Sequence, residues 1–396
     1  AQPNFGQDST FSGFTAAGGY KDSAGIGDFK YPVPANALAM CSANLPITTP
    51  SIVRPQKHFD TVLYTGNASD QKITGLEFKP DMIWFKSRTS TSTHGMADSV
   101  RGRSKLFYPD TNQTEETRDS TRDLVSVDDG GFTVGNPQRL NSTNGSGLSI
   151  VAWCWKAGGN SNNFNVDGVG YATQAAAGIH AGNLSLTGAS VNTEAGFSII
   201  TWTGDGQSSA DVGTGLSSDK PLSWAIVKKT STSSDWQVGH RGSGQGRNFA
   251  YHYNLNDSST LSGSSPYHMG SQNATNGDRL YLAGDGAANT VTYVAYVWQE
   301  KTGYSKFGSY TGNGNADGPF IYTGFKPAFL IVKRTNSSGD DWNMWDSTRR
   351  TFNLTTLNLK PNASNAEGTA DNHGFDLLSN GFKPRGSSDA AKGSNS

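Results

Sequence analysis

Short apolar runs broken by polar turns recur along the chain, and three of them share one pattern. Each begins with a Lys-Pro step, continues through mostly apolar residues and ends in a lysine; the runs span residues 79–86, 220–228 and 326–333. A continuous apolar run of this length, bounded by a proline and by polar residues, is typical of a β-strand buried on both faces. The pattern therefore predicts a central strand in each of three related units.

The segments before these runs repeat as well. Each unit has an aromatic-Thr-Gly step upstream of its Lys-Pro, at Tyr64-Thr65-Gly66, Trp202-Thr203-Gly204 and Tyr310-Thr311-Gly312. Two units also close on an aromatic, apolar run, at residues 148–156 and 291–299, and the third shows no counterpart. Self-similarity at a fixed spacing indicates an array of one module. We expect something to cover the edge that the third module leaves open, because exposed strand edges aggregate.

We predict an all-β chain built of tandem β-sandwich modules. The first repeat covers residues 59–159, the second residues 197–303, and the third, which looks incomplete, residues 304–396. Residues 160–196 are expected to be a connector. Residues 1–58 are broken by prolines and lack the apolar content for a core of their own, so we interpret them as the end of a preceding domain followed by a linker.

Composition agrees with many short strands and argues against two classes of partner. The chain has 48 glycines and only 16% charged residues, as expected of strands joined by tight turns. Its formal net charge of -1 gives no electrostatic reason to expect nucleic acid. No stretch approaches the roughly 20 apolar residues of a membrane-spanning helix, so insertion into a membrane is not expected.

The two cysteines, Cys41 and Cys154, are too few for a disulfide framework or a four-ligand zinc site. Aligning the two closing runs places Cys154 where the second repeat has Val297. A valine at the sister position indicates a packed, apolar environment. We therefore expect Cys154 to be a small buried hydrophobic residue rather than a disulfide partner or a reactive thiol; whether both thiols are free is left open.

One polar position recurs after the central run of every repeat. An acid or an imidazole is followed closely by an arginine, at Asp98 and Arg101, His240 and Arg241, and Asp346 and Arg349. Recurrence within a repeat usually reflects shared architecture. The simpler interpretation is therefore an ion pair or hydrogen bond that fastens a loop to the sandwich, with Asp98, Arg101 and Asp346 as structural positions.

The alternative interpretation is a carbohydrate-binding edge. Indole rings stack on the apolar face of a pyranose, while nearby polar side chains bond its hydroxyl groups. Trp236, Trp342 and Trp345 would supply the rings, and the polar partners would be His240, Arg241 and Arg349.

The sequence carries none of the common catalytic and metal-binding motifs. The sequence has no Gly-x-Ser-x-Gly elbow, His-Glu-x-x-His pair, phosphate loop or Cys-x-x-Cys. Asp-Gly steps such as Asp129-Gly130 and Asp205-Gly206 could offer calcium ligands, but turn chemistry explains them without a metal. We expect no catalytic residues, no cofactor and no metal site, with calcium as the alternative.

Several segments resemble structural proteins of tailed bacteriophages of the marine type. Residues 4–9, 27–31 and 38–46 resemble the end of a SPRY-like, concanavalin-like β-sandwich found in such proteins. The repeats from Phe59 onward, with Asp98-Ser99-Val100-Arg101-Gly102 and residues 151–159, look like the module that follows this sandwich. The resemblance implies concanavalin- or jelly-roll-like modules. It also implies that most of the SPRY-like domain and the third closing strand lie outside this sequence, which would be a piece of a larger fibre-like protein.

The resemblance implies a structural and adhesive virion component, such as a tail fibre or another appendage on the particle surface. Its partners would be other virion proteins, further copies of itself and host-surface polysaccharide. Two alternatives come from other classes: a structural element of the capsid surface or baseplate that binds no ligand, and a polysaccharide-degrading tailspike-type enzyme.

Overall fold

The computed structural model describes residues 8–35, 37–41, 44, 50–159, 161–241, 252–260, 277–369 and 374–386. The chain forms two compact units, Ala1–Thr49 and Pro50–Ser396. In the first unit an isolated bridge pairs Tyr20 with Phe29. Parts of the predicted domain remnant and linker, residues 1–7, 36, 42–43 and 45–49, lie outside the described residues. All three repeats belong to the second unit, which begins with the short 3-10 helix η2 (Pro55–Lys57).

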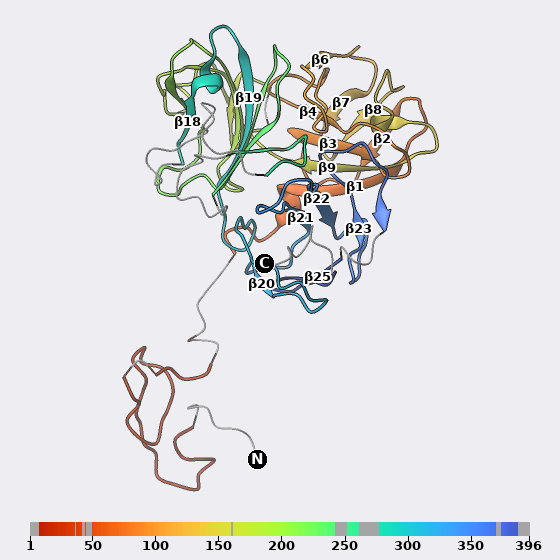
Figure 1. The fold of residues 1–396 in the computed structure, drawn as a ribbon. Helices are drawn as coiled ribbons and strands as arrows, with labels where there is room; N and C mark the ends of the chain where they lie inside the picture. The colour runs from red at the N-terminus through yellow and green to blue at the C-terminus, as the bar shows by residue number, and fades with distance from the viewer. Residues whose placement is uncertain are drawn as a thin grey trace. The chain divides into compact units, whose positions relative to one another are not determined.

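The first repeat is a sandwich of two antiparallel sheets (Figure 1). The larger sheet has the order β1 (Phe59–Thr65), β9 (Ser149–Trp155), β3 (Met82–Ser87) and β4 (Gly95–Asp98). The smaller sheet has the order β2 (Gln71–Thr74), β8 (Gly131–Val134) and β7 (Leu124–Asp128). A hairpin and a short helix complete it: β5 (Lys105–Leu106), β6 (Glu116–Thr117) and α1 (Asn141–Asn144). The closing strand β9 thus lies between the opening and central strands.

The second repeat uses the same arrangement. Its large sheet has the order β11 (Val169–Tyr171), β10 (Phe164–Val166), β12 (Leu186–Asn192), β13 (Phe197–Thr203), β19 (Thr292–Trp298), β15 (Trp224–Lys229), β16 (Gln237–His240) and β17 (Tyr253–Asn254). A second sheet pairs β14 (Ser209–Gly213) with β18 (Arg279–Ala283), which is followed by η3 (Gly284–Ala287). Here β19 lies between β13 and β15, as β9 lies between β1 and β3.

The third repeat has smaller sheets. Its pairs are β21 (Phe329–Val332) with β22 (Asn343–Asp346) and β23 (Leu357–Asn358) with β24 (Gly368–Thr369), and the three-stranded sheet has the order β20 (Ile321–Tyr322), β26 (Gly381–Pro384) and β25 (Phe375–Leu378). Within the described residues, β21 has no counterpart of β9 or β19 beside it. The aromatic segment at Tyr310, which opens this repeat, is likewise not a strand. The observed all-β sandwich architecture confirms the predicted fold class.

The central strands are buried on both faces, which explains their continuous apolar pattern. In β3, Ile83 and Phe85 point into the core of the first sandwich. Met82 and Trp84, which alternate with them, point into a different core on the opposite face of the sheet. The same alternation holds in β15, where Ala225 lies in the core of its own sandwich.

The core that Met82 and Trp84 enter is shared by all three repeats. It contains Trp84 and Trp153 of the first repeat, Trp224 and Trp298 of the second, and Trp342 of the third. Ring contacts cross between repeats, for example Phe59 with Phe329 at 5.5 Å between centroids. The repeats are therefore modules joined around a common aromatic core, and not an array in which each sandwich buries its apolar face alone.

The expectation that residues 160–196 are a connector was wrong. They contribute β10, β11 and β12 to the large sheet of the second repeat, with β12 paired along β13. The signal was weak because Gly188 and Ser190 interrupt the apolar residues of β12. The Ser190 hydroxyl donates to Asp81 at 3.2 Å, which ties this segment to the first repeat.

Candidate functional site

The recurrent polar residues occupy one equivalent place in each repeat. In the antiparallel pairs of the central strands, Asp98 faces Met82, His240 faces Trp224 and Asp346 faces Phe329. Each therefore ends the strand beside its central strand, next to the shared core. Asp98, His240 and Asp346, which the sequence spacing aligned, are therefore structurally equivalent.

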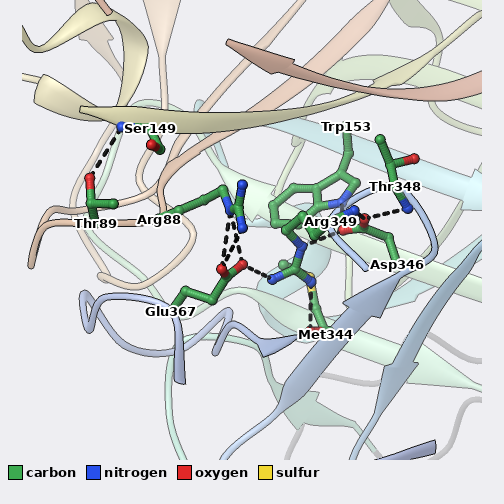
Figure 2. A network of polar contacts seen from close by, with 9 residues as sticks. All are labelled: Arg88, Thr89, Ser149, Trp153, Met344, Asp346, Thr348, Arg349 and Glu367. Atoms are coloured by element: carbon green, nitrogen blue, oxygen red, sulfur yellow. Dashed lines mark hydrogen bonds and ion pairs between the residues drawn. The ribbon is translucent and has the colours of Figure 1, made fainter. Parts of the chain in front are cut away.

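Asp346 of the third repeat is bonded to the first repeat (Figure 2). Its Oδ2 accepts the indole N–H of Trp153 at 3.0 Å and the Nε–H of Arg349 at 2.5 Å. Arg349 also donates to Glu367 at 2.8 Å, and Glu367 in turn pairs with Arg88 of the first repeat at 2.7 Å. Arg349 and Asp346 have no exposed side-chain surface. This network is a buried, charge-assisted connection between two repeats.

Asp98 of the first repeat makes the matching connection to the second. Its Oδ2 accepts the hydroxyl of Tyr296 at 2.6 Å and the Nε–H of Arg101 at 2.6 Å. Arg101 also pairs with Glu115 at 2.9 Å. Tyr296 on β19 corresponds to Trp153 on β9, because each lies two residues before the tryptophan that ends its strand. Both networks thus join the closing strand of one repeat to the polar turn of another.

The pair of His240 and Arg241 does not follow this arrangement. Arg241 comes directly after the histidine, whereas Arg101 and Arg349 come three residues after their aspartates. The Arg241 N–H donates to Ser223 O at 3.1 Å, a bond that Ser99 and Ser347 make in the other repeats. Burial lowers the pKa of His240 to about 4, so the imidazole is neutral near pH 7. The second repeat therefore shares the position of the recurrent polar residues but not the aspartate–arginine pair of the other two repeats.

The residues that directly precede β4, β16 and β22 also make hydrogen bonds between repeats. The indole N–H of Trp236 donates to two carbonyls of the first repeat, Tyr108 O at 3.2 Å and Thr111 O at 3.1 Å. That of Trp342 donates to Asn254 O of the second repeat at 2.9 Å. In the first repeat the equivalent residue is His94, whose Nε2 lies 3.0 Å from Lys360 O of the third. Each repeat thus bonds the previous one around the shared core, and the first bonds the third.

The buried tryptophans have no open face for a sugar. Trp236 and Trp345 are 0% exposed and Trp342 is 5% exposed, so none of the three can stack on a pyranose in this structure. Arg349 is also buried in the network of Figure 2. Of the candidate sugar-binding residues, His240 is half-buried and Arg241 is exposed.

Three lysines, of which Lys86 and Lys228 are buried and Lys333 is half-buried, make further contacts between repeats, which the sequence interpretation missed. Lys86, Lys228 and Lys333 lie at or just after the ends of the three central strands. Each donates to a carbonyl of another repeat: Ser364 O at 3.2 Å, Asn112 O at 3.1 Å and Ser258 O at 3.3 Å. Burial lowers the pKa of Lys86 and of Lys228 to about 8. The shared lysine at the end of each apolar run was the available signal, but it reads equally well as the turn to solvent.

A groove lies beside Arg241, the exposed residue among the sugar-binding candidates. It has a volume of about 460 Å³ and lies where the second repeat meets the start of the third. Its lining combines an aromatic ring, Phe307, with the charged side chains of Lys220, Arg241 and Glu300. Of the predicted sugar-binding residues, Arg241 lines this groove.

Neither Cys41 nor Cys154 forms a disulfide. Cys154 is fully buried and has no disulfide partner, and burial raises the pKa of its thiol well above the usual range. This confirms that it packs as a small hydrophobic residue. Cys41 is also unpaired.

The described ranges contain no group of three or more His, Cys, Asp or Glu side chains that could hold a metal ion. In the same ranges, no helix has the length and apolar character of a membrane span.

Comparison with known proteins gave one result. A family model described as "Domain of unknown function (DUF7483)" matches residues 54–396, which include all three repeats and the residues described above. The searches of curated proteins and of solved structures gave no match.

Proposed function

The chain belongs to the DUF7483 family of domains of unknown function, and we propose that it is a structural module of a bacteriophage virion appendage, such as a tail fibre. The observation that carries the proposal is that the recurrent polar residues connect one repeat to another. Asp98 and Asp346, with their arginines, bond one repeat to another inside the molecule. A role that bears load benefits from connections of this kind, because buried charge-assisted bonds resist separation of the repeats.

The placement on a phage particle rests on the resemblance of residues 4–46 and of the repeats to virion proteins. Gold-labelled antibodies against residues 50–396 should mark an appendage on particles of the phage that encodes the chain. Labelling confined to the lysate, with none on intact particles, would contradict the proposal. Labelling of the capsid surface or baseplate would favour the alternative location.

Contact with host-surface polysaccharide is the second function that we propose, and the groove beside Phe307 supports it. An aromatic ring next to Arg241 and Glu300 offers a stacking surface with hydrogen-bonding groups at its edge. Arg241→Ala and Phe307→Ala should each weaken binding to a glycan array or to host cells. Lys21→Ala, in the other compact unit, serves as the control. A folded protein that binds no glycan would leave the purely structural role.

The rival enzymatic function has a direct test. Purified protein incubated with host polysaccharide should release no new reducing ends if its role is structural. Release of reducing ends would show that the chain is a polysaccharide-degrading enzyme and would overturn the structural proposal.

A further inference from the structure

The second repeat departs from the other two at the recurrent arginine. Arg101 and Arg349 come three residues after an aspartate, and their side chains are only 4% and 0% exposed. Arg241 follows His240 directly and is exposed. It lines the groove beside Phe307. The position that holds two repeats together elsewhere thus places a cation at the surface of the second repeat.

A second cation reaches the same groove from another segment. Lys220 lies shortly before β15, whereas Arg241 directly follows β16. The Arg241 N–H donates to Ser223 O at 3.1 Å, which holds the end of β16 against the segment that begins at Lys220. Both exposed side chains line the groove. In the part of the chain that the structure describes, neither of them forms an ion pair.

The acid that lines the groove, Glu300, already has partners. Its Oε1 lies 2.7 Å from the Lys306 Nζ, and its Oε2 accepts the Phe307 N–H at 3.3 Å. The charge of this carboxylate is therefore largely balanced before a ligand arrives. The cations Lys220 and Arg241 remain to interact with one.

Asp219 offsets the charge of Lys220 only in part. It is exposed and precedes Lys220 in the sequence. Its carboxylate accepts the Ser217 hydroxyl, a bond that lowers its pKa, and the charges of Lys220 and Lys301 lower the pKa further. One acid is thus shared by two lysines, and water screens all three charges.

The aromatic ring of the groove is fixed by the shared core. Phe307 is half-buried and packs against that core. Its ring centroid lies 5.9 Å from that of Trp224 and 6.5 Å from that of His240. A ring held in this way can stack on the apolar face of a pyranose with little further loss of side-chain freedom. The charged residues of the same groove would then contact substituents of that sugar.

We propose that this groove binds an acidic sugar residue, one that carries a carboxylate or a sulfate group. The inference rests on the proposed contact with host polysaccharide and names the class of glycan. Arg241 offers paired N–H donors that match two oxygens of either anion, and Lys220 offers a compact charge. A neutral sugar would gain the stacking on Phe307 alone and leave both cations without a counter-charge.

Two pairs of oligosaccharides test the charge of the ligand on the full chain. Hexagalacturonate is compared with its fully methyl-esterified form, and a sulfated galactan oligosaccharide is compared with its desulfated form. Isothermal titration calorimetry should show that at least one acidic form binds about tenfold more tightly than its neutral partner, as expected of two exposed ion pairs. The preference should shrink at high salt, which screens exposed charges. The two pairs also distinguish a carboxylate from a sulfate.

Removal of single cations locates the site. Arg241→Gln and Lys220→Gln should each weaken binding of the acidic form by about threefold and leave that of the neutral form nearly unchanged. Lys72→Gln removes an exposed lysine of the first repeat and changes the net charge equally. This control should bind both forms as the unchanged protein does.

Glu300→Gln should change the affinity in the opposite direction. The amide oxygen can still accept the Phe307 N–H, while Lys306 loses its counter-charge. The acidic form should therefore bind about threefold more tightly. A neutral sugar bonded to the carboxylate would instead bind more weakly. The matched control is Glu77→Gln, which releases Arg54 from an exposed pair in the first repeat and should have no effect.

The outcomes separate this inference from the function on which it rests. Equal binding of acidic and neutral forms, lost in Phe307→Ala, would overturn the acidic class and keep the contact with host polysaccharide. Acidic binding that Arg241→Gln and Lys220→Gln leave intact, or that Glu300→Gln weakens, would contradict the proposed site. If none of the four oligosaccharides binds to protein that is folded by circular dichroism, both the inference and the contact with polysaccharide fail.

Discussion

Single polar side chains inside the molecule connect repeats that are far apart in the sequence. Trp153 and Asp346 lie 193 positions apart, and Tyr296 and Asp98 lie 198 apart, yet both pairs are hydrogen-bonded in buried surroundings. A buried charge that loses its partner costs far more than the same charge at the surface. The stability of the fold should therefore depend strongly on these few residues.

Asp346→Ala should lower the free energy of unfolding by about 3 kcal/mol, because it leaves the guanidinium of Arg349 buried with Glu367 as its remaining carboxylate partner. The control is Glu77→Ala, which breaks the exposed pair with Arg54 and should cost less than about 1 kcal/mol. Urea denaturation of both variants checks the difference. Equal losses would show that the network in Figure 2 is not a buried connection.

His94 should make the protein sensitive to mild acid. Its Nδ1 accepts the Trp84 indole N–H at 2.9 Å, so the ring proton lies on Nε2, which faces Lys360 O. Burial lowers the pKa of His94 well below its usual range, and the nearby Lys86 lowers it further. As the pH falls through about 6.5, the unfolded chain takes up this proton and the folded chain does not, so stability falls.

We predict that His94 accounts for up to about 2 kcal/mol of the stability lost between pH 6.5 and pH 5. His94→Gln keeps an acceptor and a donor but does not titrate. It should show a smaller fall in Tm than the unchanged protein when the pH is lowered from about 7.5 to about 5. An identical fall in both proteins would mean that His94 is protonated in the folded state.

At the scale of elements, alternation within a strand decides which core a residue joins. The apolar runs predicted the central strands correctly, since Ile83 and Met82 each had a core to enter on opposite faces. The segment at residues 186–192 could not be predicted in the same way, because its burial comes from pairing along β13 and from packing of small residues. Such pairing depends on tertiary contacts that no local pattern records.

The membership of β12 in the sheet leads to a prediction on matched valines. Val191 in β12 is fully buried, whereas Val169 in β11 is 51% exposed. Val191→Ala should cost about 2 kcal/mol through lost apolar burial and the cavity left behind, and Val169→Ala should change stability by less than about 0.5 kcal/mol. Chemical denaturation of both variants provides the comparison. Indifference to both changes would indicate that residues 160–196 are a connector after all.

At the scale of the whole second unit, the repeats depend on one another. A linear array would leave each repeat in contact with its neighbours only. Here the first repeat contacts the third through Arg88 and Glu367, and the second through Asp98 and Tyr296. The sequence predicted the all-β sandwich architecture of this unit. It could not predict the closure of the repeats around one core, because the residues that form it, such as Trp84 and Trp342, look like ordinary strand residues locally.

Differential scanning calorimetry of the full chain tests this closure most directly. If the three repeats share one core, residues 50–396 should unfold in one main transition, with a calorimetric enthalpy close to the van't Hoff enthalpy. Asp346→Ala should move that whole transition to lower temperature without splitting it. Three separable transitions, or a shift confined to the third repeat in the variant, would contradict the shared core.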